Sequence, residues 1–272
     1  MYKDILVHAE EQPAGAARFA AACALARRHD ARLIALFALE FAELPGYVAA
    51  QIGEEALRRA REAYLAHAAR ARARLEAAAG RADVHFEWRE APGAARDLLV
   101  EHGRYADLII IGQPDPEQDG ARPQGFPGEL ALASGRPLLT IPYAGRHDDL
   151  GRRALVAWNA SREATRAVHD ALPLLRAAES VVVLAVDPPE QGHIPGADIA
   201  AHLAHHGVHV EARHSVAPDI EVGDELLNMA SDLGSDLIVM GAYGRSRLRE
   251  AVFGGATRHI LEHMTVPVLM AH

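Results

Sequence analysis

The residues best suited to binding chemistry lie in a glycine-rich segment near the end of the chain. This segment, Gly241-Ala-Tyr-Gly-Arg-Ser-Arg and onward to Leu261, leaves an apolar run and leads into a stretch of helical period. Glycine lets the backbone approach a ligand closely, and unpaired N–H groups at a helix N-terminus bind anions. The pattern therefore predicts a phosphate cradle made of backbone amides.

The predicted cradle also has side-chain parts. Arg245 or Arg247 would add a guanidinium group, and Thr257 would add a hydroxyl group. Such a cradle needs no lysine, which suits a chain whose only lysine is Lys3. The phosphate-binding set that we expect is Gly241, Gly244, Arg245, Gly254, Gly255, Ala256 and Thr257.

The scarcity of lysine and the net charge exclude several classes of protein. Beyond Lys3 there is no lysine for a Walker motif or a Schiff base. A formal charge of -9 argues against a general nucleic-acid surface. No apolar run reaches the roughly 18 to 20 residues of a membrane helix, and the N-terminus lacks the apolar core of a signal peptide. We expect a cytoplasmic protein that binds neither nucleic acid nor membrane.

An internal repeat supplies the framework for this segment. The stretch Ala106–Gly112 returns as Ser235–Gly241, and other segments recur in the same order. Two copies of one domain, over residues 1–146 and 152–272, are the simplest explanation. A short polar stretch would link them.

Each copy alternates short apolar runs with longer stretches of helical period. Near-continuous apolar runs such as Val181–Val186 indicate strands buried on both faces, as in a parallel sheet covered by helices. Cys23 falls on the apolar face of a predicted helix, so we expect a core residue rather than a nucleophile. The strands expected in the second copy are Ala154–Ala157, Val181–Val186, Val208–Arg213, Asp236–Met240 and Val266–Ala271.

The glycine spacing resembles the ATP-binding signature of the universal stress protein (UspA-like) family. Gly241-x2-Gly244-x9-Gly254 follows the fourth strand of a five-strand repeat, and the resemblance covers essentially the whole chain in a tandem two-domain form. It implies an α/β fold of two tandem doubly wound domains. Each would be a five-stranded parallel sheet in the order 3-2-1-4-5, flanked by helices, with a nucleotide lying across the switch between strands one and four.

The resemblance also implies which residues approach the base. Asn159 follows the first strand of the second copy, and Val186 and Asp187 end its second strand. These residues would lie near adenine. The chain departs from the family pattern at two positions, because Asn159 replaces an aspartate and Gly255 replaces a Ser or Thr.

The first copy is a degenerate version of the same loop. Gly112 and Gly125 keep the outer spacing, but Asp115 takes the inner glycine position and Pro127 follows where helical amides should be free. Carboxylates repel phosphate and proline lacks the N–H donor. We expect no ATP site in this copy.

A histidine-rich segment raises the question of a metal. Its spacings of three and four residues could place imidazoles on one helical face. The 16 histidines are, however, spread along the whole chain, so zinc is disfavoured and no metal ligand is assigned. The histidines of the segment are His193, His202, His205, His206, His209 and His214.

The function expected from these features is nucleotide-dependent regulation in a stress response. The second copy would bind ATP, or else ADP or AMP, with or without Mg²⁺, and no catalytic residue is assigned. A slow ATPase of the same fold and a scaffold with two vestigial loops are the alternatives. Besides the nucleotide we expect an unidentified protein partner. The resemblance further implies an intrachain pseudo-dimer joined through the last strands, with a homodimer left open.

Overall fold

The computed structural model describes residues 1–10, 13–40, 53–115, 125–147, 149–188, 195–217, 219–243 and 255–272. In the first half of the chain the elements are β1 (Asp4–His8), α1 (Pro13–His29), β2 (Arg32–Leu39), α3 (Glu54–Ala82), β3 (Phe86–Pro92), α4 (Ala95–Gly103), β4 (Leu108–Gly112), α5 (Phe126–Ser134) and β5 (Leu138–Ile141). In the second half they are β6 (Arg153–Ala157), α6 (Arg162–Leu175), β7 (Ser180–Val186), α7 (Ala197–His205), β8 (Val210–Ser215), α8 (Val222–Asp232), β9 (Leu237–Gly241), α10 (Ala256–His263) and β10 (Val268–Ala271).

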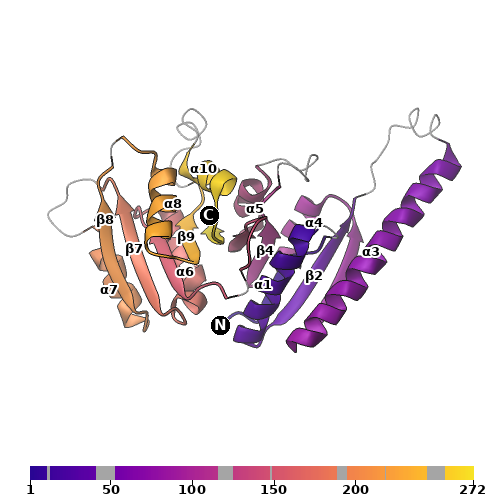
Figure 1. Cartoon of the computed structure of the whole chain (residues 1–272), viewed down its shortest axis with the longest axis horizontal. Helices are drawn as coiled ribbons and strands as arrows, with labels where there is room; N and C mark the ends of the chain where they lie inside the picture. Colours follow the sequence, from indigo (N-terminus) through magenta and orange to yellow (C-terminus); the bar gives the residue numbers. More distant parts are fainter. Residues whose placement is uncertain are drawn as a thin grey trace.

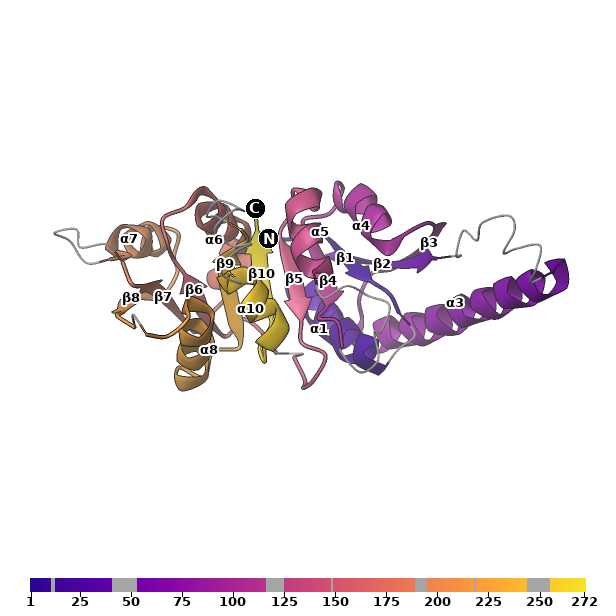
Figure 2. The same cartoon turned by 90° about the horizontal axis from the view of Figure 1, so that it is seen from above.

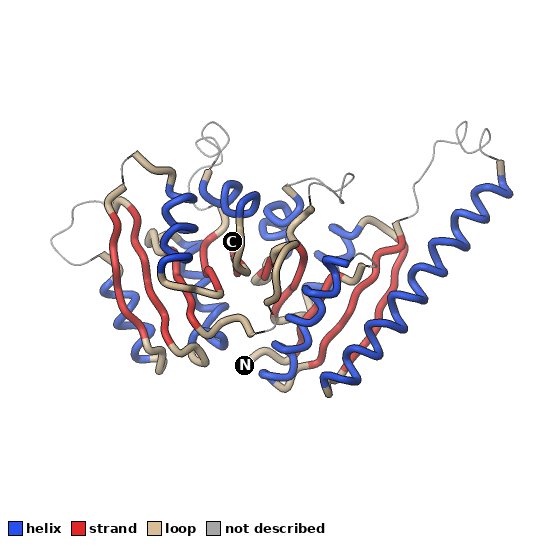
Figure 3. The backbone as a smooth tube through the Cα atoms, in the orientation of Figure 1, coloured by secondary structure: helices blue, strands red, loops and turns tan. Residues whose placement is uncertain are grey.

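All these strands form one continuous sheet. Its order is β3-β2-β1-β4-β5-β10-β9-β6-β7-β8, and pairing is parallel throughout each half. The halves meet where β5 and β10 pair antiparallel, with Leu269 opposite Leu139. Figure 3 shows the strands running through the whole molecule. The prediction of two doubly wound α/β units in tandem is therefore confirmed.

Helices cover both faces of the sheet because its central strands are apolar on both faces. β4 and β9, for example, are each buried along four successive residues. Side chains of α1, α3, α6 and α7 pack into the core on one face, and those of α4, α5, α8 and α10 pack into the core on the other. The helices of the second group are seen beside the central strands in Figure 2. This is the layering that parallel strands require.

The predicted strand Val208–Arg213 is displaced by two residues, since β8 begins at Val210. The helix before it, α7, ends at His205 and is followed by Gly207, whose φ of +79° suits glycine, and the Val208 amide donates back to the carbonyl of Leu203. This hydrogen bond makes Val208 part of the turn that ends α7, so Val208 is not part of β8. Sequence periodicity does not show which residues a helix cap will use.

Cys23 lies in the core as expected, with 5% of its surface exposed. Burial raises the pKa of its thiol to about 11. A thiol in this state is a poor nucleophile.

The longest helix, α3, extends beyond the end of the sheet (Figures 1 and 2). Its outer part carries arginines that pair with glutamates on the same helix, such as Arg58 with Glu55 at 2.8 Å and with Glu62 at 2.5 Å. This favours a solvated surface over a site for an anionic partner. Within the described residues, none of the helices combines the length and the apolar character that crossing a bilayer requires.

Candidate functional site

The candidate site lies at the carboxyl edge of the second half of the sheet. β6 pairs with β7 on one side and with β9 on the other, and all three run parallel. Their carboxyl ends therefore open toward the same edge. From β6 the chain continues to β7, and from β9 it continues to β10, which lies on the opposite side of the β6–β9 pair. The two connections therefore diverge, which makes this edge a switch point of the kind where doubly wound sheets bind ligands.

Gly241 ends β9 directly against the first turn of α6. A Cβ atom there would lie 2.5 Å from the amide nitrogen of Ala164 and 2.7 Å from the carbonyl carbon of Glu163. Both distances are far shorter than van der Waals contact, so any other residue would displace the helix. Gly241 thus has a packing role, whatever it also does for a ligand.

The loops at this edge hold strained backbone. Ala160 after β6, Asp187 after β7 and Tyr243 after β9 all have positive φ, at 57°, 44° and 55°. Left-handed backbone is uncommon in residues other than glycine and tends to gather at functional sites. Among the described residues, the other two non-glycine examples, Asp30 and Asp83, lie at the opposite edge, ahead of β2 and β3.

Side chains fix the two loops that we expect near adenine. The Oδ1 atom of Asn159 accepts a hydrogen bond from the Ser161 amide at 3.1 Å, and Ser161 in turn caps α6. The Oδ1 atom of Asp187 accepts from the Ala217 amide at 2.9 Å. Both loops are therefore pre-formed, and both side chains are exposed at the edge. Val186, which ends β7, is half-buried beside them.

The N-terminus of α10 has the properties of an anion site. Among the described residues no side chain caps its first turn, and that turn contains no acidic residue. Gly255 and Ala256 are half-buried there. Thr257 is almost fully buried, and its hydroxyl oxygen accepts a hydrogen bond from the Tyr243 amide at 3.2 Å. This bond ties the start of the loop to the helix at its end. The other three predicted cradle residues, Gly244, Arg245 and Gly254, lie outside the described residues.

Sequence reasoning missed one acidic residue at this edge, Glu163. It is 6% exposed, and it lies in the first turn of α6 against Gly241. Burial alone would raise the pKa of its carboxyl group, but a backbone hydrogen bond and the Arg162 guanidinium at 3.0 Å hold that pKa below the usual range. Only its place in the first turn of a predicted helix signalled it beforehand.

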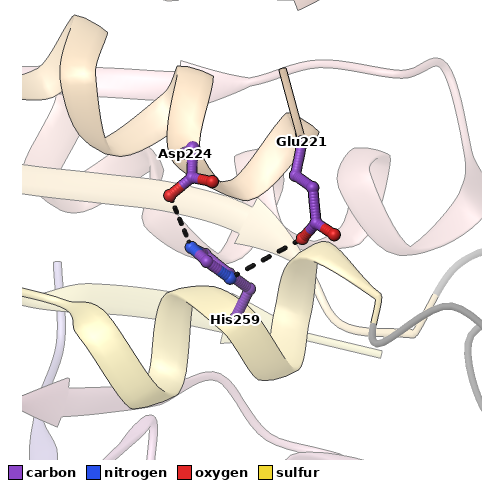
Figure 4. A group of neighbouring side chains, drawn as sticks. All are labelled: Glu221, Asp224 and His259. Atoms are coloured by element: carbon purple, nitrogen blue, oxygen red, sulfur yellow. Dashed lines mark hydrogen bonds and ion pairs between the residues drawn. The ribbon is translucent and has the colours of Figure 1, made fainter. Parts of the chain in front are cut away.

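A second feature missed by the sequence holds α10 in place. The His259 ring, from the first half of α10, lies between the carboxylate of Asp224 in α8 and that of Glu221, the residue just before α8 (Figure 4). Its Nε2 atom is 2.8 Å from Asp224 Oδ1, and its Nδ1 atom is 3.7 Å from Glu221 Oε2. A Cβ at Gly223 would lie 2.7 Å from the ring, so glycine makes room for it. Each carboxylate faces a different ring nitrogen, which is the arrangement of a clamp between helices.

The corresponding edge of the first half is filled by the chain itself. The Nη1 atom of Arg18 lies 2.5 Å from where a Cβ of Gly112 would be. Its Nη2 atom donates to Glu10 Oε2 at 2.5 Å, and only 3% of Arg18 is exposed. The helix that follows, α5, has Pro127 and Glu129 in its first turn, where the second half has no acid. In the first half, Arg18 therefore occupies the space beside Gly112, and Glu129 would repel an anion at the start of α5.

The fold defines a tandem, doubly wound α/β protein in which Arg18 packs against Gly112 at the first-half switch point, while the second-half switch point carries the candidate site. The profile of the Universal stress protein family matches residues 1–120 and 151–272, so the chain belongs to that family.

Solved structures with the same fold include a universal stress protein from Archaeoglobus fulgidus. Its TM-score is 0.75 at 14% identity, covering 98% of this chain and 96% of that one. A functionally unknown protein from Pseudomonas aeruginosa reaches 0.59 at 17% identity, covering 98% and 92%. A universal stress protein of Methanocaldococcus jannaschii is 34% identical over 47 residues, which span 17% of this chain and 29% of that relative.

Proposed function

We infer that the second half of this universal stress protein binds an adenine nucleotide, ATP or ADP, and that binding regulates a partner in a stress response. The observation that carries the proposal is the contrast between the two switch points. In the second half the uncapped, acid-free start of α10 faces the carboxyl edge of β6 and β9. In the first half Arg18 covers Gly112 and an acid begins α5.

Backbone amides would hold the phosphates. The amides of Gly255, Ala256 and Thr257 open α10, where the helix dipole and free N–H groups favour an anion. Gly241, Gly244 and Gly254 would keep the loop close to the phosphates, and Arg245 would add its guanidinium group. Thr257 also fixes the loop by accepting from Tyr243.

The base and ribose would lie toward β6 and β7. Asn159 and Asp187 already hold their loops through single oxygen atoms, Oδ1 in each case. The Nδ2 atom of Asn159 and the Oδ2 atom of Asp187 could then pair with ribose or adenine. Val186 would supply apolar contact. Mg²⁺ bound with ATP would neutralise phosphate charge, and no described carboxylate is assigned to it.

We also propose the organisation around this site. Domains over 1–146 and 152–272 would form a pseudo-dimer through β5 and β10, leaving the first domain to pack against the second. In support, the Tyr2 hydroxyl donates to the Asp170 carbonyl at 2.7 Å, and a Cβ at Gly128 of α5 would collide with the Tyr243 ring. The loop of the site therefore touches the first half. A cytoplasmic location, a protein partner and a homodimer stay predictions.

Identification of the small molecules that heat releases from freshly purified, untagged protein tests the proposal. ATP or ADP that persists unhydrolysed on incubation is the expected result. Hydrolysis of the bound ATP to ADP during the incubation would favour the slow-ATPase alternative instead. A site with no released nucleotide and no affinity for added ATP or ADP would favour a scaffold and overturn nucleotide binding.

A further inference from the structure

Two helices of the second half bring histidines together away from the candidate nucleotide edge, about half the length of α6 from it. His169 lies in the second half of α6, and His202 lies near the end of α7. Their Nε2 atoms are 3.3 Å apart, and their rings meet edge to face with centroids 5.2 Å apart. The sequence does not predict this pair, because His169 is outside the histidine-rich segment.

We propose that His169 and His202 bind a transition-metal ion, with His206 completing the site. Two nitrogens held by one tetrahedral zinc ion at about 2.0–2.1 Å lie roughly 3.3 Å apart. The two Nε2 atoms already have this separation. They cannot both carry a proton at that distance, so at least one directs a lone pair toward the other.

His206 extends the site by one helical turn. It follows His202 by four residues at the end of α7, and the two ring centroids are 4.7 Å apart. Imidazoles at i and i+4 lie on one helical face and are a common pair of metal ligands. A change in the His206 side-chain torsion angles would add a third nitrogen to the two that already converge.

The chemistry of the ligands selects the ion. Neutral imidazole suits Zn²⁺, Ni²⁺ and Cu²⁺, whereas Mg²⁺ and Ca²⁺ prefer oxygen. His169 and His206 are exposed and His202 is half-buried, so solvent can reach the ion and complete its coordination. An ion there would join α6 to α7. The site is independent of the nucleotide, since α6 starts at the nucleotide edge and carries His169 half its length away.

Zinc alone tests the site, titrated into untagged, chelator-treated full-length protein without nucleotide. Calorimetry should show one saturable site per chain. His169→Ala and His202→Ala should each weaken it by about tenfold or more, and His206→Ala should weaken it less. His205→Ala is the matched control, an exposed neighbour on α7 that should leave affinity unchanged. Cobalt bound to the wild type should give the intense visible bands of tetrahedral coordination.

Four results would overturn the site. These are no saturable binding, unchanged affinity in His169→Ala and His202→Ala, an equal loss in His205→Ala, or a loss confined to His259→Ala. The last result would place the ion between α8 and α10. Thermal melting of the apo His169→Ala and His206→Ala variants should match the wild type because these side chains are exposed, and melting of apo His202→Ala checks that the loss of a half-buried ring leaves the fold intact. A variant that melts early is replaced by the corresponding Gln substitution.

Discussion

The side-chain amide of Gln113 donates a hydrogen bond to the carbonyl of Leu261 at 2.9 Å, joining the two halves of the chain. The same nitrogen is 3.2 Å from the Glu262 carbonyl, and Gln113 is 5% exposed. Gln113 directly follows Gly112, the first-half counterpart of Gly241. In the second half, the loop after Gly241 is the one that we propose binds phosphates. In the first half, Gln113 at the corresponding position instead holds the last turn of α10.

Gln113→Ala should lower the free energy of unfolding by roughly 1–3 kcal/mol, because it leaves buried carbonyl groups without their donor. Urea denaturation followed by circular dichroism measures the change. Glu101→Ala, an exposed substitution on α4, should stay within about 0.5 kcal/mol of the wild type and serves as the control. Equal stability of Gln113→Ala and this control would show that the contact contributes nothing.

His259→Ala should loosen α10 against α8. Losing the hydrogen bond to the Asp224 carboxylate should cost about 1–2 kcal/mol. Hydrogen exchange should speed up at the amides of α10, and ATP affinity should fall because those amides form the proposed cradle. His205→Ala on α7 is the control. If α10 exchanged at the wild-type rate in His259→Ala, the clamp would have no positioning role.

Stability should fall as the pH drops from 6.5 toward 4, in part because of His29. Burial, followed by the nearby Arg28 and N-terminal charges, lowers the pKa of this imidazole to about 4. Its ring packs against Tyr2, with centroids 4.9 Å apart. Between pH 4 and 6.5 the unfolded chain binds the proton and the folded chain does not, so acid favours unfolding.

At pH 5 this linkage should amount to about 2 kcal/mol. Denaturation of the wild type and of His29→Gln at pH 7 and pH 5 isolates it, since other groups titrate alike in both proteins. The variant should lose less stability than the wild type over this interval. Equal losses would mean that His29 is protonated in the folded state as readily as in the unfolded state.

Cys23 should be unreactive in the folded protein. With 5% exposure and a pKa raised to about 11, it presents almost no thiolate at pH 8. An aromatic disulfide reagent should label one thiol per chain in guanidinium chloride and label native protein only at the rate of unfolding. Fast native labelling would contradict the core placement.

The fold was predictable to a large extent because its signal is local and repeated. Apolar runs such as Val181–Val186 are long enough to indicate strands buried on both faces, and the return of Ala106–Gly112 as Ser235–Gly241 indicates the tandem. Strand ends were less certain, as the shift of β8 to Val210 shows.

The side-chain contacts between elements were not predictable, since they join residues far apart in the chain. Gln113 reaches across 148 residues to Leu261, and His169 reaches across 33 residues to His202. Periodicity reports which face of an element is apolar but not which polar side chains meet across elements. For the same reason, the sequence predicts that the first-half loop is degenerate but does not predict that Arg18 covers Gly112.

The most direct test of the central claim is calorimetric titration of ATP into full-length protein, wild type and two glycine variants. Gly244→Asp copies Asp115 of the first half into the proposed cradle. Gly80→Asp is the matched control, because, apart from the local backbone of α3 itself, no described atom lies within 4 Å of a Cβ at that position. We predict one ATP per chain in the wild type and in Gly80→Asp, and no saturable binding in Gly244→Asp. Two sites per chain, or unchanged affinity in Gly244→Asp, would contradict a single nucleotide site in the second half.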